Sequence, residues 1–257
     1  MSSFKGVYLG PPLTPSDLSP LSTSTGSLPF ILGSTSSTRA MILSSLDIPY
    51  TVKVKEIDER SIGKDIRQRG TKEDARELVA MLARAKRDAL APIILSDLSS
   101  SENEGGVLLA TGDQVVTHED MGILEKPLTI SEASQFMEGY RRVPKVTTVG
   151  SFLLTHYPSG IEVCEVFEAS VLFHQDLLKK DEEERLGGMR KGLLEELVES
   201  GAPVLKCAGG LMVENEIVKN FIKEVQGGED AVLGLSRKAV LECMEVMDGK
   251  LREGVGK

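Results

Sequence analysis

A short apolar run that ends in a loop rich in serine and threonine constrains the fold of this chain more than any other feature. Residues 29–32 are apolar, and Gly33-Ser34-Thr35-Ser36-Ser37-Thr38-Arg39 follows them directly. This pattern predicts a strand over 28–33, a tight loop, and a helix over about 38–46. The N–H groups and hydroxyls at such a helix start, with the Arg39 guanidinium, favour an anion such as phosphate. An ordinary helix N-cap is an equally good explanation of the same residues.

The rest of the chain continues the alternation of strands and helices. Thr71 and Asp74, and again Thr129 and Glu132, have the spacing of a capping box, which marks two helix starts. Strands interleaved with helices predict an α/β domain with a mixed sheet. The expected strands after the first lie at 50–57, 107–116, 145–156 and 161–173, and the expected helices lie at 72–91, 130–140, 191–200 and 231–247.

Length and composition predict one main domain. The chain has 257 residues, which suffices for a single large α/β domain over 28–257 with polar insertions near 96–106 and 177–190. Residues 1–27 are rich in Ser, Thr, Pro and Gly, and Lys5 is their one cation. A transit peptide is normally rich in arginine and amphipathic. We therefore expect a disordered tail over 1–27.

Charge and cysteine content exclude several classes of function. The net charge of −9 argues against a surface that binds a nucleic-acid polymer. The three cysteines are far apart and have no zinc-ligand spacing, which favours a reducing compartment such as the cytoplasm. No run of about 18 apolar residues is present, so we expect no membrane-spanning segment.

Four polar side chains are candidates for chemistry. Asp113 follows an apolar strand, where α/β sheets place ligand-contacting groups, but it is also a good turn residue after Gly112. Lys126 precedes Pro127 and is typical of surface charge as well as of phosphate binding. Lys86 lies near the edge of an apolar helix face, where a lysine often extends to solvent. Glu59, like Asp58, follows a strand and is suited to a divalent cation or to a turn.

The candidates occur in blocks that resemble the Maf family of nucleoside triphosphate pyrophosphatases. The blocks keep the order and approximate spacing of that family from residue 29 to about 247. They are Ile31-Leu32-Gly33-Ser34-Thr35-Ser36-x-x-Arg39, Ile57-Asp58-Glu59, Ala83-x-x-Lys86, Thr111-Gly112-Asp113-Gln114-Val115-Val116, Glu125-Lys126-Pro127-Leu128 with Glu132-Ala133, Thr147-Thr148-Val149, Cys207-Ala208-Gly209 and Val232-Leu233-Gly234-Leu235.

The resemblance implies a fold and a reaction. The fold is two-lobed, around an elongated mixed sheet, with the nucleotide in the cleft between the lobes. The reaction converts a nucleoside triphosphate to the monophosphate and pyrophosphate with a divalent cation (Mg²⁺, Mn²⁺ or Co²⁺). By matched position Asp113 is the proton acceptor for the attacking water, and Glu59 joins it at the metal. The phosphate-binding groups implied are Ser34, Ser36, Arg39, Lys86 and Lys126.

Three positions bear on which base is preferred. Gln114 after Asp113, with Glu214 further on, resembles the relatives that act on 7-methyl-GTP more than those that act on dTTP and UTP. A carboxylate can accept two hydrogen bonds from the guanine edge and suits a cationic ring. Thr38 stands where the 7-methyl-GTP enzymes often carry Trp, and Glu214 could instead be solvated surface.

Alternatives remain open. A nucleotide-binding regulator linked to cell division, with little turnover, and a dTTP/UTP pyrophosphatase both fit the resemblance, which also leaves a homodimer open. The absence of the GxxxxGK[ST] pattern from the sequence argues against a P-loop NTPase.

Overall fold

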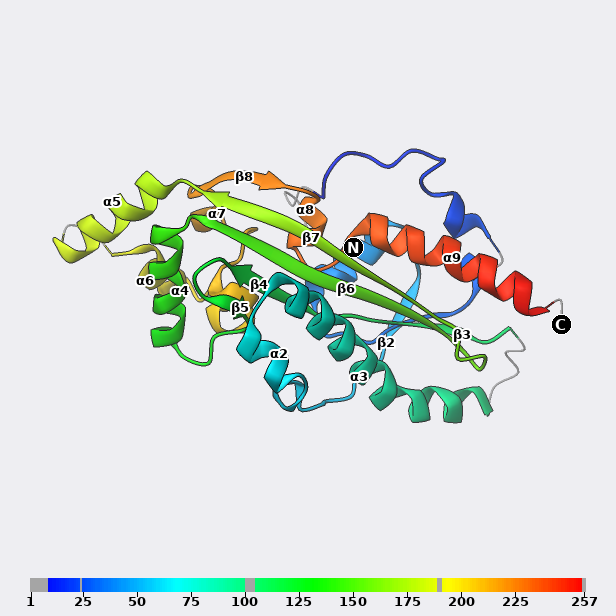
Figure 1. Ribbon diagram of the computed structural model, residues 1–257. Helices are drawn as coiled ribbons and strands as arrows, with labels where there is room; N and C mark the ends of the chain where they lie inside the picture. Colours follow the sequence, from blue (N-terminus) through cyan, green and yellow to red (C-terminus); the bar gives the residue numbers. More distant parts are fainter. Residues whose placement is uncertain (1–8, 24, 100–104, 189–190, 256–257) are drawn as a thin grey trace.

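A single elongated mixed sheet forms the centre of the molecule (Figure 1). The structure is a computed structural model that describes residues 9–23, 25–99, 105–188 and 191–255. The strand order is β2-β1-β3-β6-β4-β5, and β7 pairs with both β6 and β8. The strands are β1 (Phe30–Leu32), β2 (Tyr50–Val52), β3 (Val107–Thr111), β4 (Gln114–His118), β5 (Gly122–Leu124), β6 (Lys145–Tyr157), β7 (Glu162–Phe173) and β8 (Ile222–Gln226). The α/β class with a mixed sheet is therefore confirmed.

The β6–β7 hairpin connects the two ends of the sheet. β6 pairs antiparallel with β3 along one part of its length and with β4 along another. On its other edge it pairs with β7 almost from end to end. β1 is parallel to both β2 and β3, which makes the sheet mixed.

Helices cover the sheet on both faces (Figure 1). The capping box at Thr71 forms: the Asp74 N–H donates to Thr71 Oγ1 at 3.1 Å, and the Thr71 N–H donates to Asp74 Oδ2 at 3.0 Å. At Thr129 only the N-cap half forms, because the Glu132 N–H donates to Thr129 Oγ1 at 3.1 Å while the Glu132 carboxylate accepts from the Leu128 N–H at 2.7 Å. In the described part of the chain no helix is long and apolar enough to cross a membrane. The α-helices are α1 (Ser37–Ser45), α2 (Lys64–Arg69), α3 (Lys72–Ser99), α4 (Ile130–Arg142), α5 (Gln175–Leu186), α6 (Leu193–Glu199), α7 (Glu216–Lys219), α8 (Glu229–Val232) and α9 (Arg237–Val255).

Two large apolar clusters give the molecule its two lobes. One packs α1 and α9 against β1 and β3, with Ile42, Leu108 and Met247 at its centre. The other packs α4 and α6 against β7, and Met137 and Leu197 are buried in it. Both clusters take side chains from β6, so the hairpin joins the lobes.

Several expected boundaries differ from the structure. The strand expected over 50–57 ends at Val52, and the helix expected over 72–91 continues to Ser99 through Pro92. The expected helix over 231–247 is divided into α8 and α9, because Gly234 has φ 110° between them. Of the two expected insertions, 96–99 belongs to α3 and 177–186 to α5, while 100–104 and 189–190 lie outside the described residues.

The expectation of a disordered segment over 1–27 differs from the structure wherever the segment is described. Residues 9–23 and 25–27 lie along α9 and contain two short 3₁₀-helices, Ser19–Ser22 and Thr25–Ser27. The polar composition of this segment gave no sign that four of its leucines pack against the core beside β1. Thr25 Oγ1 also donates to Asp248 at 2.8 Å in a buried position. The leucines are Leu9, Leu13, Leu18 and Leu21.

Candidate functional site

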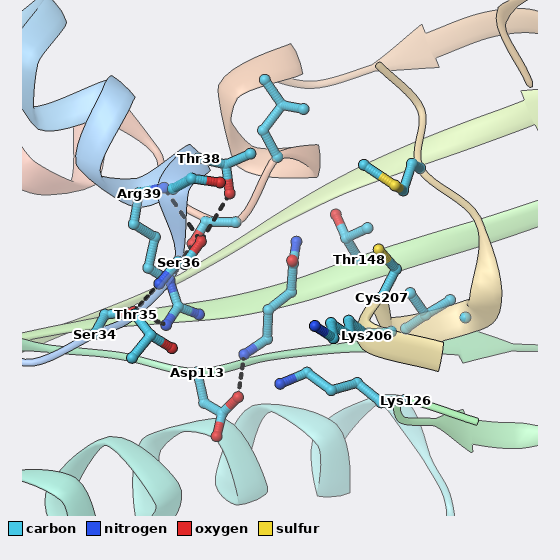
Figure 2. A pocket seen from close by; sticks show the side chains of 18 of the residues that line it. Ser34, Thr35, Ser36, Thr38, Arg39, Asp113, Lys126, Thr148, Lys206 and Cys207 are labelled. Carbon is cyan, nitrogen blue, oxygen red and sulfur yellow. Dashed lines mark hydrogen bonds between the residues drawn. The ribbon is translucent and has the colours of Figure 1, made fainter. Parts of the chain in front are cut away.

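One cavity of about 850 Å³ lies where the two lobes meet (Figure 2). Its walls come from the β1–α1 loop, the segment after β2, the middle of α3, the β3–β4 corner, the β5–α4 connection and the two loops 203–214 and 232–234. The structure brings together all ten residues that the sequence singled out, which are Ser34, Ser36, Thr38, Arg39, Glu59, Lys86, Asp113, Gln114, Lys126 and Glu214.

Asp113 lies at the corner between β3 and β4, and its backbone is tightly fixed. A Cβ on the preceding Gly112 would lie 2.2 Å from the Ser151 carbonyl oxygen, so this close approach requires glycine. The Asp113 N–H donates to Ser151 Oγ at 3.1 Å. The Gln114 N–H donates to Asp113 Oδ1 at 2.7 Å. One carboxylate oxygen is therefore held by the backbone, and the other, Oδ2, accepts from the Lys86 ammonium.

Lys86 joins the two candidate carboxylates. Its ammonium lies 2.9 Å from Asp113 Oδ2 and 2.8 Å from Glu59 Oε1, and its side chain is 17% exposed. The helix is placed for this contact because the Thr111 hydroxyl donates to the Ala83 carbonyl at 2.8 Å. Lysine between two carboxylates removes most of their mutual repulsion. The side chain is turned inward, so it does not extend to solvent.

Arg39 connects three segments of the wall. Its guanidinium donates to the Gly234 carbonyl at 3.0 Å and to the Gly112 carbonyl at 2.9 Å, and it has a longer contact of 3.4 Å with Ser34 Oγ. Burial lowers the pKa of Arg39, and the carboxylates of Asp113 and Glu59 oppose that shift. Arg39 thus supports the shape of the cavity as well as contributing positive charge to it.

The start of α1 has the N-cap that the sequence left open. Ser36 Oγ accepts from the Arg39 N–H at 3.3 Å and lies 2.8 Å from Thr38 Oγ1 (Figure 2). The Ser36 N–H donates to Ser34 Oγ at 3.2 Å. The hydroxyls therefore cap the helix and line the cavity at the same time, so the two interpretations of this loop are compatible.

The side-chain amide of Gln114 mainly forms structural hydrogen bonds and is not wholly available to recognise a base. Its amide nitrogen donates to the carbonyls of Ala231 and Val232, each at 3.0 Å. Both N–H groups of the amide are thereby used to hold α8 beside the cavity. Only the amide oxygen remains for a ligand.

The opposite wall carries Lys126, Cys207 and Glu214. The Lys126 side chain extends from the β5–α4 connection toward Asp113 (Figure 2), and in the described chain no ion pair holds it. Burial, with the negative charge of Glu214, raises the pKa of the Cys207 thiol to about 11, and Lys126 acts in the other direction. Glu214 and Cys207 both line the cavity.

Sequence reasoning missed two cations of the cavity wall. Lys55 and Lys206 line the cavity, and no role was assigned to either. Lys206 directly precedes the Cys207-Ala208-Gly209 block, which was the one available signal. Lys55 belongs to a segment whose alternation predicted a strand, and that pattern carries no information about a ligand.

The carboxylates suit a hard divalent cation that also binds substrate. Among the residues described, no group of three His, Cys, Asp or Glu side chains could hold a metal ion by itself. Glu59 and Asp113 are the pair that shares Lys86. Magnesium is typically bound by one or two carboxylates together with substrate phosphates, so this pair fits the group.

Comparison with known families identifies the chain. The model of a family described as "Maf-like protein" matches residues 29–247, which include every cavity residue that the sequence predicted. The chain belongs to the Maf family. The eight blocks that suggested the resemblance all lie inside the matched range, so that expectation is confirmed.

Two known proteins extend the comparison. A protein from Dictyostelium discoideum, described as a 7-methyl-GTP pyrophosphatase, is 26% identical over 211 residues, which are 82% of this chain and 93% of that protein. A nucleoside-triphosphatase (dITP/XTP pyrophosphatase) of Mycobacterium abscessus is 11% identical, with a TM-score of 0.34, over 58% of this chain and 74% of its own. A TM-score this low carries no argument about the Maf site.

Proposed function

We propose that the chain hydrolyses a nucleoside triphosphate to the nucleoside monophosphate and pyrophosphate. The observation that carries this proposal is the bridge Glu59–Lys86–Asp113 at the centre of a cavity whose other walls supply Arg39 and Lys126. Phosphoryl transfer needs an oriented nucleophile and positive charge around the transferring group, and this arrangement offers both. Membership of the Maf family and the name of the Dictyostelium relative support the same reaction.

In the proposed reaction Asp113 orients a water molecule and accepts its proton as the water oxygen bonds to the α-phosphorus. The bond between the α-phosphorus and the bridging oxygen then breaks, and pyrophosphate leaves with that electron pair. Lys126 and the hydroxyls of Ser34 and Ser36 bind phosphate oxygens. Arg39 adds charge and keeps the β3–β4 corner in place.

Glu59 and Asp113 are the residues that would hold a divalent cation (Mg²⁺, Mn²⁺ or Co²⁺), which would neutralise phosphate charge. Lys86 holds the same carboxylate oxygens through its ammonium, so a cation bound there would compete with it. Lys86 would then be available to bind phosphate oxygens of the leaving pyrophosphate. The same lysine thus balances the carboxylates before the substrate binds and the phosphates afterwards.

For the base we propose 7-methyl-GTP or a related purine nucleotide. Glu214 lines the cavity, and its influence on Cys207 supports a position in the wall rather than on open surface. A carboxylate at this position can accept from the N1–H and N2–H₂ groups of guanine. Thr38, at the start of α1, leaves room beside the base but offers no aromatic face.

Pyrophosphate release tests the proposal across a panel of nucleotides, with Mg²⁺, Mn²⁺ or Co²⁺ in separate series. The panel contains 7-methyl-GTP, GTP, ATP, dTTP, UTP and modified purine triphosphates. Turnover of any member, lost when the metal is chelated, supports the reaction. An efficiency at least about tenfold higher on UTP or dTTP overturns the proposed base preference. Binding of nucleotide without turnover would instead favour a regulator, the second function that the family resemblance left open.

A further inference from the structure

Arg67 is the centre of a hydrogen-bonded network beside the cavity, and no reaction step uses it directly. Its guanidinium donates to both carboxylate oxygens of Glu125, at 2.6 and 2.9 Å. It also donates to the Glu59 carbonyl at 3.1 Å and to the Ile62 carbonyl. The side chains of Arg67 and Glu125 are 16% and 24% exposed, so the pair is largely shielded from water. A paired, two-pronged contact of this kind fixes orientation as well as distance.

The helix that carries Arg67 is itself well anchored. α2 has only six residues, and it lies between Gly63 and Gly70, both with positive φ. Ile66, the neighbour of Arg67, is 3% exposed and packs with Leu78 and Val115 in the core under α3. A Cβ on Gly63 would lie 2.8 Å from Leu78 Cδ1, which shows how closely α2 approaches α3. Arg67 therefore projects from a rigid base.

The partners of Arg67 are the backbones that present cavity residues. Glu59 is one of the two carboxylates that share Lys86, and its own carbonyl accepts from Arg67. Glu125 directly precedes Lys126, and the Glu125 carbonyl accepts from the Gly209 N–H at 3.1 Å. One guanidinium thus connects the segment of Glu59, the segment of Lys126 and, through Glu125, the loop that contains Cys207.

We infer that Arg67, through Glu125, is a positioning residue that sets the distance between the carboxylate Glu59 and the phosphate-binding Lys126. The inference rests on the proposed function, because Glu59 and Lys126 matter only if the cavity binds a nucleotide and its metal. Without the two-pronged contact, the two segments lose their common partner on α2. Glu59 and Lys126 then move independently of each other, while Asp113 keeps its own backbone contacts.

The test uses Arg67→Lys and Glu125→Gln in the full chain. Each change keeps a polar side chain but removes the two-pronged contact. The double variant Arg67→Glu with Glu125→Arg restores opposite charges in reversed order. Arg76→Lys is the control for loss of a guanidinium–carboxylate contact elsewhere, since Arg76 pairs with Glu168 at 2.7 Å through a single, more exposed contact and does not line the cavity.

Three measurements distinguish positioning from simple support of the fold. We expect the metal concentration for half-maximal activity to rise about 10- to 100-fold in both single variants. We expect kcat/KM to fall about a hundredfold at saturating metal, with a melting temperature close to that of the control. Hydrogen exchange of residues 57–62 and 125–126 should quicken in the variants and not in Arg76→Lys.

The outcomes separate this inference from the proposed function. Unchanged exchange at 57–62 and 125–126 overturns the inference, whether or not the protein is an enzyme. So does a loss of activity that matches the loss of folded protein, with an unchanged metal requirement. If the wild type releases no pyrophosphate from any nucleotide, the proposed function fails, and the exchange rates alone then decide whether Arg67 holds the two segments. Partial recovery of metal dependence in the charge-reversed double variant supports the inference.

Discussion

Replacing Asp113 with Asn separates the chemistry of the site from its stability. The amide keeps the size of the side chain, and its oxygen can still accept from the Gln114 N–H, now at 2.7 Å. Losing a general base typically costs 10²–10⁴-fold in rate, which corresponds to about 2.7–5.4 kcal/mol of activation free energy. We therefore expect turnover at saturating metal to fall to about 1% of the wild type or less.

The same substitution should change the free energy of unfolding far less. Lys86 loses one carboxylate, but Glu59 remains 2.8 Å from its ammonium. The ion pair between Lys86 and residue 113 becomes a hydrogen bond from the ammonium to a neutral amide oxygen, a difference of about 1 kcal/mol, and relief of carboxylate repulsion acts against it. For a chain of this size that corresponds to a shift in melting temperature of about 2–4 °C.

The assay is pyrophosphate release at saturating Mn²⁺, combined with thermal unfolding of the same preparations. Asp120→Asn is the control, because Asp120 lies in the turn between β4 and β5, outside the cavity, and pairs only loosely with Arg142 at 3.6 Å. If Asp113→Asn keeps more than about a tenth of wild-type turnover, Asp113 is not the proton acceptor. A large fall in melting temperature in this variant would contradict the expectation that Glu59 alone is a sufficient partner for Lys86.

Three further predictions concern other parts of the molecule. Lys126→Ala should raise KM for the nucleotide about tenfold or more with little change in melting temperature, because no ion pair holds Lys126 in the described chain. Unchanged kinetic constants would show that Lys126 is ordinary surface charge and does not bind phosphate. Glu214→Gln should reduce the preference for 7-methyl-GTP over UTP. By removing a negative charge it should also lower the pKa of the Cys207 thiol from about 11, so that iodoacetamide modifies Cys207 faster at pH 8. An unchanged rate of modification would show that Glu214 does not act on Cys207. Deleting residues 1–27 should lower the melting temperature and leave kcat unchanged, because the described residues of this segment, 9–23 and 25–27, pack against the core and α9 and do not line the cavity.

Local signals in the sequence predicted local structure well. The capping box at Thr71 and the N-cap at Thr129 mark two helix starts through contacts between residues three apart, so a single segment contains the signal. The two strands of the β6–β7 hairpin, predicted on either side of Tyr157-Pro158-Ser159-Gly160, lie within a residue of their expected bounds. The alternation of polar and apolar residues overextended the strand at 50–57, because Val52 and Val54 are exposed. In the described part of the chain, pairing with β1 ends at Val52 apart from one bond from the Lys53 N–H to the Leu32 carbonyl.

Contacts between distant segments could not be predicted in the same way. Arg67 and Glu125 are separated by 58 positions and carry no pattern that links them. The N-terminal leucines are spaced among prolines and serines, so composition favoured disorder although each leucine meets the core. In both cases the partner surface is made by the fold itself, and a segment taken alone contains no trace of it.

Lys86 shows how the two kinds of information combine. Its place near the edge of the apolar face of α3 was correct, and from that alone a lysine extending to solvent was the natural interpretation. The direction of the side chain is decided by what lies across from it, and there the β3–β4 corner presents Asp113 while the segment before α2 presents Glu59. Two carboxylates this close need a cation between them, whichever cation is available. A site that uses its own lysine for that purpose keeps its carboxylates in place, and in the proposed reaction a divalent cation held by Glu59 and Asp113 would take over this role when a nucleotide brings further negative charge.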